Sequence, residues 1–174
     1  MDLNLVKVPN KVTIEIDSRE KFPLLFPANI RYFDESGSPK LIRVETIVTH
    51  LPTGDYRMKE FPTGCLIERK GAARELATNL LGPDRRRCLS AIRRLCDSCH
   101  RPILLCDFSM ADLQRDQPNL PAGRLVSAVA RLVSEYGLTL LIAGPCKRST
   151  YRKQLGATIV HFMLSEGVSN ELRS

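Results

Sequence analysis

The first part of the chain contains short segments in which apolar and polar residues alternate. Residues 11–17 (KVTIEID) and 41–48 (LIRVETIV) follow a period of two and are rich in β-branched side chains, which predicts two strands. Residues 56–59 and 64–70 predict a third and a fourth strand after a turn. The intervening residues 22–37 are rich in proline and turn-forming residues, so we expect a loop there with at most a short helical turn.

After residue 70 the spacing of the apolar positions becomes helical. Leu76, Leu80 and Leu81 mark one face of a helix that Gly82-Pro83 ends. Three more helices are predicted, over residues 84–99 with Asp84 as N-cap, 124–136, and 147–166 with an interruption near Gly156. The continuously apolar residues 103–107 and 138–143 predict buried strands, and residues 119–123 predict a turn.

Strands that gather early and then alternate with helices predict an α/β fold with a mixed central sheet flanked by helices. The 174 residues correspond to one domain, because domains commonly contain roughly 100–200 residues. The chain is 43% hydrophobic and lacks tryptophan, and this composition excludes a disordered, collagen-like or coiled-coil protein.

The net charge of +7 favours a polyanionic partner, because basic side chains gain free energy by displacing counterions from phosphates. No stretch of the sequence approaches the roughly 20 apolar residues needed to span a bilayer, and the start, MDLNLVKVPNK, has no apolar signal core. We therefore expect an intracellular protein without a membrane partner, and the sequence does not distinguish cytoplasm or nucleoid from nucleus.

The six cysteines are expected to be reduced and buried as small apolar residues. The segment 96–100, CDSCH, also matches half of a zinc site or a haem-attachment motif. The second CxxC pair or paired histidines of a zinc finger are missing, which favours the packing interpretation.

Acidic residues fall at predicted strand ends and turns, at Asp17, Glu20, Asp55 and Glu68. Glu68 and Lys70 are two residues apart, so they project from the same side of a strand. Converging carboxylates favour a hard divalent cation such as Mg²⁺, which can activate a water that a nearby lysine orients. On spacing alone, a solvated strand end with ordinary ion pairs remains the alternative.

Three segments in this order, IDSRE (16–20), TGDY (53–56) and IERK (67–70), resemble the nuclease domain of the XPF family. That family is a branch of the restriction-endonuclease-like PD-(D/E)XK nucleases. The resemblance covers roughly residues 11–165 and includes the later order of helices and strands. It implies a single nuclease domain over residues 1–174 with a restriction-endonuclease-like fold. Unlike its relatives, which carry a helix-hairpin-helix module after this domain, the sequence is expected to have none.

The resemblance also implies roles for individual residues. Asp55 and Glu68 would bind Mg²⁺, for which Mn²⁺ could substitute, and Lys70 would assist the attacking water. Asp17 and Glu20 would complete the acidic cluster, with Asp17 as a further metal ligand.

Two groups of arginines are candidates for contacts with DNA. By resemblance, Arg19 and Arg69 would orient carboxylates or contact the scissile phosphate, and structural salt bridges are an equal alternative. The predicted helix 84–99 has too many arginines for every guanidinium to be paired within the protein. A subset should therefore contact phosphates. The alternative is that these arginines form a solvated face of the helix. These helix arginines are Arg85, Arg86, Arg87, Arg93 and Arg94.

The sequence departs from the family pattern at Arg74, where an aspartate commonly follows the ERK motif by four positions. Glu75 stands one position later, and one residue corresponds to about 100° of rotation on a helix. We therefore do not expect Glu75 to replace that aspartate. Depending on which way it points, Arg74 would weaken metal binding by repulsion or attract a DNA phosphate. We expect it to make the enzyme weak, slow or dependent on a partner.

The expected function is a magnesium-dependent DNA endonuclease that acts on branched, flapped or distorted DNA in repair or recombination. The resemblance implies a homodimer or a heterodimer with a related domain. The apolar faces of residues 125–133 and 151–162 are candidates for the contacts, and packing of these faces on the chain's own sheet is the alternative. The alternative is a catalytically silent DNA-binding or scaffolding partner of an active nuclease. A small-molecule enzyme finds no support, because neither a Walker pattern nor GxGxxG is present.

Overall fold

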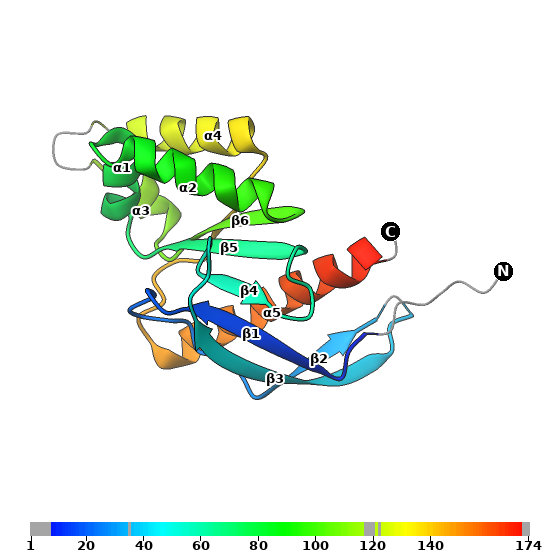
Figure 1. The fold of residues 1–174 in the computed structure, drawn as a ribbon. Helices are drawn as coiled ribbons and strands as arrows, with labels where there is room; N and C mark the ends of the chain where they lie inside the picture. Colours follow the sequence, from blue (N-terminus) through cyan, green and yellow to red (C-terminus); the bar gives the residue numbers. More distant parts are fainter. Residues whose placement is uncertain (1–7, 35, 117–120, 122, 172–174) are drawn as a thin grey trace.

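A single mixed sheet of seven strands forms the centre of the molecule (Figure 1). The computed structural model describes residues 8–34, 36–116, 121 and 123–171. The strand order in the sheet is β2-β3-β1-β4-β5-β6-β7. The strands are β1 (Lys11–Asp17), β2 (Asn29–Phe33), β3 (Pro39–Thr49), β4 (Tyr56–Met58), β5 (Cys65–Lys70), β6 (Arg101–Cys106) and β7 (Thr139–Ile142).

The strand directions bring the ends of several strands to one edge of the sheet. β1 pairs in parallel with β3, and β6 pairs in parallel with β5 on one side and with β7 on the other. The short strand β4 is antiparallel to both β1 and β5. β1, β5 and β6 therefore end at the same edge, which is also the edge where β4 begins.

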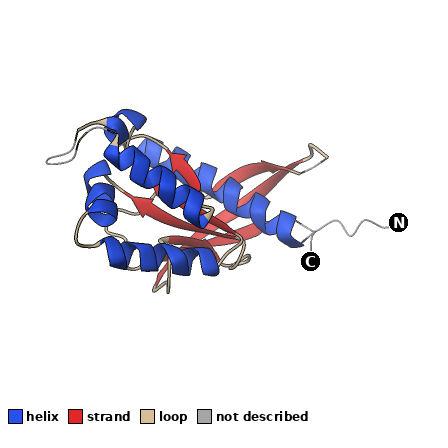
Figure 2. Cartoon of the chain, turned by 90° about the horizontal axis from the view of Figure 1, so that it is seen from above, coloured by secondary structure: helices blue, strands red, loops and turns tan. Residues whose placement is uncertain are grey.

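Helices cover the two faces of the sheet unequally (Figures 1 and 2). On one face, α1, α2 and α4 pack over β5 and β6 through residues that include Leu76, Ile92 and Leu132. On the other face, the long helix α5 packs against β4 and β5, and its Ile159 and Met163 belong to the core cluster on that side. The helices are α1 (Ala73–Leu81), α2 (Arg85–Asp97), α3 (Met110–Gln114), α4 (Arg124–Tyr136) and α5 (Ser149–Glu171). No helix in the described part of the chain has the length and hydropathy needed to cross a bilayer.

The predicted α/β fold with a mixed sheet flanked by helices is confirmed, with three differences in the elements. Part of the predicted loop 22–37 is strand β2, which pairs antiparallel with β3. α5 is continuous through Gly156. A glycine is found there because the backbone of Leu25 lies against the helix and leaves no room for a Cβ. The short helix α3 was not predicted, and the predicted turn at 119–123 lies largely outside the described residues.

All six cysteines are free thiols, in agreement with the packing interpretation. Cys65, Cys106 and Cys146 are buried, and Cys96 and Cys99 pack beside the cluster under α1, α2 and α4. Burial raises the pKa of the Cys99 thiol to about 11.

Candidate active site

Asp55 is fixed where β4 begins, between two strands that end at the same edge. Its backbone N–H donates to the Ile67 carbonyl at 2.7 Å, and its carbonyl accepts from the Asp17 N–H at 2.9 Å. Gly54 before it has φ +75°, and a Cβ there would also press on the Leu95 side chain and the Ile67 carbonyl. The GD turn therefore positions Asp55 beside the end of β5.

The carboxylate of Asp55 is held close to that of Glu68. Its Oδ2 accepts a hydrogen bond of 2.7 Å from the Arg69 N–H. Burial raises the pKa of Asp55, and the charges of Glu68 and Glu20 raise it further, whereas the Arg69 N–H and Lys70 oppose the rise. A buried carboxylate whose pKa is raised by a neighbouring carboxylate lies where added positive charge is favourable.

Lys70 is a buried cation beside these carboxylates. Its Nζ donates to Glu68 Oε1 at 2.9 Å, and only 11% of its side chain is exposed. Burial alone would lower the pKa of Lys70, but the charges of Glu68, Glu75 and Asp55 hold it above the ordinary value of 10.5. Lys70 is therefore an ammonium ion at neutral pH, able to donate hydrogen bonds but not to accept a proton.

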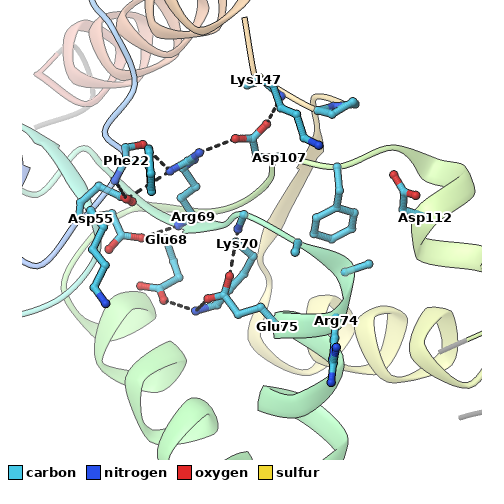
Figure 3. A pocket seen from close by; sticks show the side chains of 18 of the residues that line it. Phe22, Asp55, Glu68, Arg69, Lys70, Arg74, Glu75, Asp107, Asp112 and Lys147 are labelled. Atoms are coloured by element: carbon cyan, nitrogen blue, oxygen red, sulfur yellow. Dashed lines mark hydrogen bonds and ion pairs between the residues drawn. The ribbon is translucent and has the colours of Figure 1, made fainter. Parts of the chain in front are cut away.

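Glu75 reaches back to the same lysine from the first turn of α1 (Figure 3). Its Oε2 accepts a hydrogen bond of 3.1 Å from the Gly71 N–H, and its Oε1 lies 3.6 Å from Lys70 Nζ. Arg74 extends away from these groups. Glu75 thus reaches Lys70 at the end of β5 from the first turn of α1, although it stands one position after that of the family's aspartate.

The Asp17 carboxylate forms an ion pair with Arg19 and does not line the cavity. Its Oδ1 accepts from Arg19 Nε at 2.7 Å, and its Oδ2 accepts from Arg19 Nη2 at 2.8 Å and from the Leu51 N–H at 2.9 Å. The side chain of Asp17 is fully buried, whereas that of Arg19 is 63% exposed. Since both carboxylate oxygens are already engaged, this arrangement does not fit the metal-binding role expected of Asp17.

Arg69 is the centre of a buried ion-pair network. Its Nη1 lies 3.3 Å from Glu20 Oε1 and donates to the Phe22 carbonyl at 2.8 Å, and its Nη2 donates to Asp107. Only 9% of its side chain is exposed, so the geometry favours the salt-bridge alternative over contact with a phosphate. Glu20, the partner of Arg69, lines the cavity.

Sequence reasoning missed Asp107, which lies directly after β6. Its N–H donates to the Lys70 carbonyl at 2.9 Å, and its Oδ1 accepts from the Cys146 N–H at 2.5 Å. An acidic residue after a continuously apolar strand was a usable signal, because parallel strands end at the same edge. That signal required knowing that β5 and β6 pair.

The site opens into a cavity of about 1010 Å³ at this edge of the sheet. Asp55, Glu68 and Lys70 line it together, as the sequence predicted. Several basic side chains share its lining: Arg19, Lys21, Arg74, Arg115, Lys147 and Arg152. The α2 arginines are exposed but do not line the cavity.

The fold and the site together define a class, that of restriction-endonuclease-like proteins with carboxylates and a lysine at the strand ends. The ERCC4 domain family matches residues 16–161, most of the chain, and the protein therefore belongs to that family. This confirms the resemblance found in the three sequence motifs. A comparison with curated proteins finds no match.

Two solved structures share the fold. XPF from Aeropyrum pernix is 21% identical with a TM-score of 0.56, over 87% of this chain and 59% of that chain. XPF from Aeropyrum pernix in complex with DNA is 21% identical with a TM-score of 0.57, over 92% of this chain and 66% of that chain. The chain thus spans about three fifths to two thirds of the length of these structures.

Proposed function

We propose that this protein is a metal-dependent DNA endonuclease. The observation that carries the proposal is the convergence of Asp55, Glu68 and Lys70 on one cavity that also has basic side chains in its lining. Carboxylates attract a cation and basic side chains attract phosphates, so the cavity combines the two charges that phosphodiester hydrolysis requires. Membership of the ERCC4 domain family and the DNA complex of the XPF structure support DNA as the substrate.

The carboxylate oxygens of Asp55 and Glu68 suit magnesium better than a transition metal that prefers nitrogen or sulfur ligands. No group of three or more histidine, cysteine, aspartate or glutamate side chains in the described ranges is arranged to hold a metal ion. Asp55 and Glu68 each use one oxygen in the hydrogen bonds above, and the other has no partner within the described part of the chain. Mg²⁺ commonly takes one or two carboxylates and keeps several waters, and Mn²⁺ would suit the same oxygens.

Each residue then has a defined task. Asp55 and Glu68 hold the ion, which when bound would polarise the phosphoryl group and lower the pKa of a coordinated water. Lys70, fixed by Glu68, orients the attacking water and stabilises negative charge that develops on the phosphate. Arg19 and Lys21 offer exposed guanidinium and ammonium groups to neighbouring phosphates.

Branched, flapped or distorted DNA is the proposed substrate class, in repair or recombination, by membership of the family. A homodimer, or a heterodimer with a related domain, is proposed for the same reason. The residues expected to form dimer contacts on α4, such as Leu125 and Leu132, are buried within this chain. Tyr151 and Phe162 on α5 are exposed, so the proposed contact lies on α5.

The catalytically silent alternative is favoured by the ion pair between Asp17 and Arg19, which engages a carboxylate that the resemblance assigns to the metal. A cleavage assay separates it from the nuclease proposal. End-labelled linear, flap, fork and four-way DNAs are incubated with Mg²⁺, with Mn²⁺ and with a chelator. Cleavage of the branched DNAs with either metal, and none with chelator, is expected. Tight binding without cleavage under every metal condition would instead establish the silent partner.

A further inference from the structure

Phe22 exposes an aromatic ring at the margin of the candidate active site. Its side chain is 73% exposed, the largest value among the large apolar residues of the described chain, and it lines the cavity with Asp55 and Glu68. In Figure 3 it lies beside Asp55 and Arg69. An aromatic ring is thus left in water at the margin of a cavity that also has basic side chains in its lining.

The backbone of the loop that carries Phe22 is held by Glu20 of the same loop and by side chains from β5 and α5. The N–H of Phe22 donates to Glu20 Oε1 at 3.0 Å, and its carbonyl accepts from Arg69 Nη1 of β5 at 2.8 Å. The next carbonyl, that of Pro23, accepts from Arg152 of α5. The loop is thereby tied to groups that also line the cavity.

The residue after Pro23 completes the anchoring. The Leu24 N–H donates to the buried Tyr56 hydroxyl at 3.0 Å, and the Leu24 side chain is almost fully buried. Another aromatic residue of this segment, Phe26, packs edge-on against Tyr56 with ring centroids 5.9 Å apart. Leu24 and Phe26 thus use their side chains for packing, whereas Phe22 contributes only backbone contacts and leaves its ring in the solvent.

A ring on a fixed backbone loses little conformational freedom when it binds a flat apolar surface. The flat surface that accompanies a phosphodiester is a nucleobase, and every base can stack on an aromatic side chain. The exposed Lys21 beside Phe22 supplies a charge for the backbone of the same strand.

We propose that Phe22 stacks on a nucleobase next to the scissile phosphate, an inference that rests on the proposed nuclease function. In continuous duplex DNA each base already stacks on its neighbours, whereas a base at a junction or flap can be unstacked at lower cost. Stacking on Phe22 therefore favours unpaired bases at branch points. The ring contributes to the choice of substrate without taking part in the chemical step.

The test measures stacking directly, with the full chain and a flap DNA. The fluorescent base 2-aminopurine is placed in turn at each nucleotide flanking the junction, and Ca²⁺ replaces Mg²⁺ to prevent cleavage. Binding of the native protein should change the fluorescence at one or two of these positions. Phe22→Ala should abolish that change and raise the dissociation constant for flap DNA about 5- to 100-fold.

Matched variants separate stacking from other effects. Phe22→Trp should restore both affinity and fluorescence change, whereas Phe22→Leu, which keeps an apolar side chain without a ring, should not. Phe33→Ala removes another exposed phenylalanine, on β2 and outside the cavity, and should bind like the native protein.

Failure of the stacking proposal and failure of the proposed nuclease function would give different results. If the native protein binds and cleaves flap DNA but Phe22→Ala or Phe22→Leu binds equally well with the same fluorescence, the stacking proposal alone is overturned. If the native protein neither binds nor cleaves any of the DNAs, the proposed function is overturned and the stacking proposal with it.

Discussion

The charge on Lys70 depends on two glutamates that approach it from different directions. Glu68 lies on the same strand, and Glu75 arrives from α1 while it also binds the Gly71 N–H. A lysine that is fixed by two partners has fewer rotamers to lose when substrate binds. Glu75 is thus a positioning residue in the proposed mechanism.

Replacing Glu75 with glutamine should lower the cleavage rate about 10- to 100-fold, as is typical when a partner of a site residue is removed. The Michaelis constant should change little, because Glu75 orients Lys70 and is not proposed to contact DNA. Thr78→Ala is the matched control, since Thr78 is exposed on the same helix and does not line the cavity. A loss with Thr78→Ala as large as that with Glu75→Gln, in steady-state kinetics, would show that Glu75 has no specific role in positioning Lys70.

Asp17 should govern part of the stability of the protein in acid. The Arg19 side chain lowers the pKa of Asp17 from 3.8 to about 2, against the opposing effect of burial. Because the folded pKa is depressed, the stabilisation is fully present above about pH 4 and is lost as the pH falls toward about 2.

Asp17→Asn should therefore lower the free energy of unfolding at neutral pH by about 2 kcal/mol, the scale of hydrogen bonds to a charged group. The difference from the native protein should shrink as the pH falls through that window. Urea unfolding at a series of pH values measures both. A difference that stays constant down to the lowest pH would mean that the ion pair does not set this acid sensitivity.

At the scale of elements, the pattern of apolar positions predicts helices that bury one face and strands that are buried over most of their length. α1 and α4 are of the first kind, and β1 and β6 are of the second. β2 is different because only Ile30 among its five residues is buried, so its conformation depends on pairing with β3. Similarly, Gly156 predicted a break in the last helix, because the sequence does not reveal the loop that packs against it.

Gly156→Ala should destabilise the protein, although alanine is the better helix former. A Cβ at this position would overlap the carbonyl group of Leu25, which belongs to the backbone and cannot rotate aside. We expect a loss of about 2 kcal/mol or more in urea unfolding. Thr158→Ala, at an exposed position on the same helix, should lose less than about 0.5 kcal/mol. Equal stability of the two variants would contradict the close approach of α5 to the loop.

The arginines of α2 provide a second prediction at this scale. Arg85, Arg86 and Arg87 are exposed on the first turn of α2, outside the cavity. If they contact phosphates, the triple alanine variant should show a shallower dependence of the binding constant on salt, by about 0.9 in the logarithmic slope for each lost contact. An unchanged slope would identify them as a solvated helix face.

For the whole molecule, the sheet explains why residues distant in sequence form one site. β1, β5 and β6 end at one edge, and the turn before β4 adds Asp55 there. Sequence motifs were sufficient to predict that Asp55, Glu68 and Lys70 lie together. They were insufficient for Asp107 and Glu75, which reach the site through the pairing of β6 with β5 and through the path of α1.

The distribution of charge follows from the same arrangement. Asp55 and Glu68 line the cavity together with exposed basic groups such as Lys21 and Lys147. The net charge of +7 would favour association with DNA, and the carboxylates of the cavity would attract the cation that the proposed mechanism requires.

The most direct test of the central claim is the rate of metal-dependent cleavage of flap DNA by Glu68→Gln beside the native protein. Glu135→Gln, at an exposed position on α4, serves as the matched control. The account predicts that Glu68→Gln cleaves at least about 100-fold more slowly with Mg²⁺ and Mn²⁺. It should bind the DNA as tightly or more tightly, because a negative charge near the phosphates is removed. Cleavage by Glu68→Gln at the native rate would show that hydrolysis does not occur at this site.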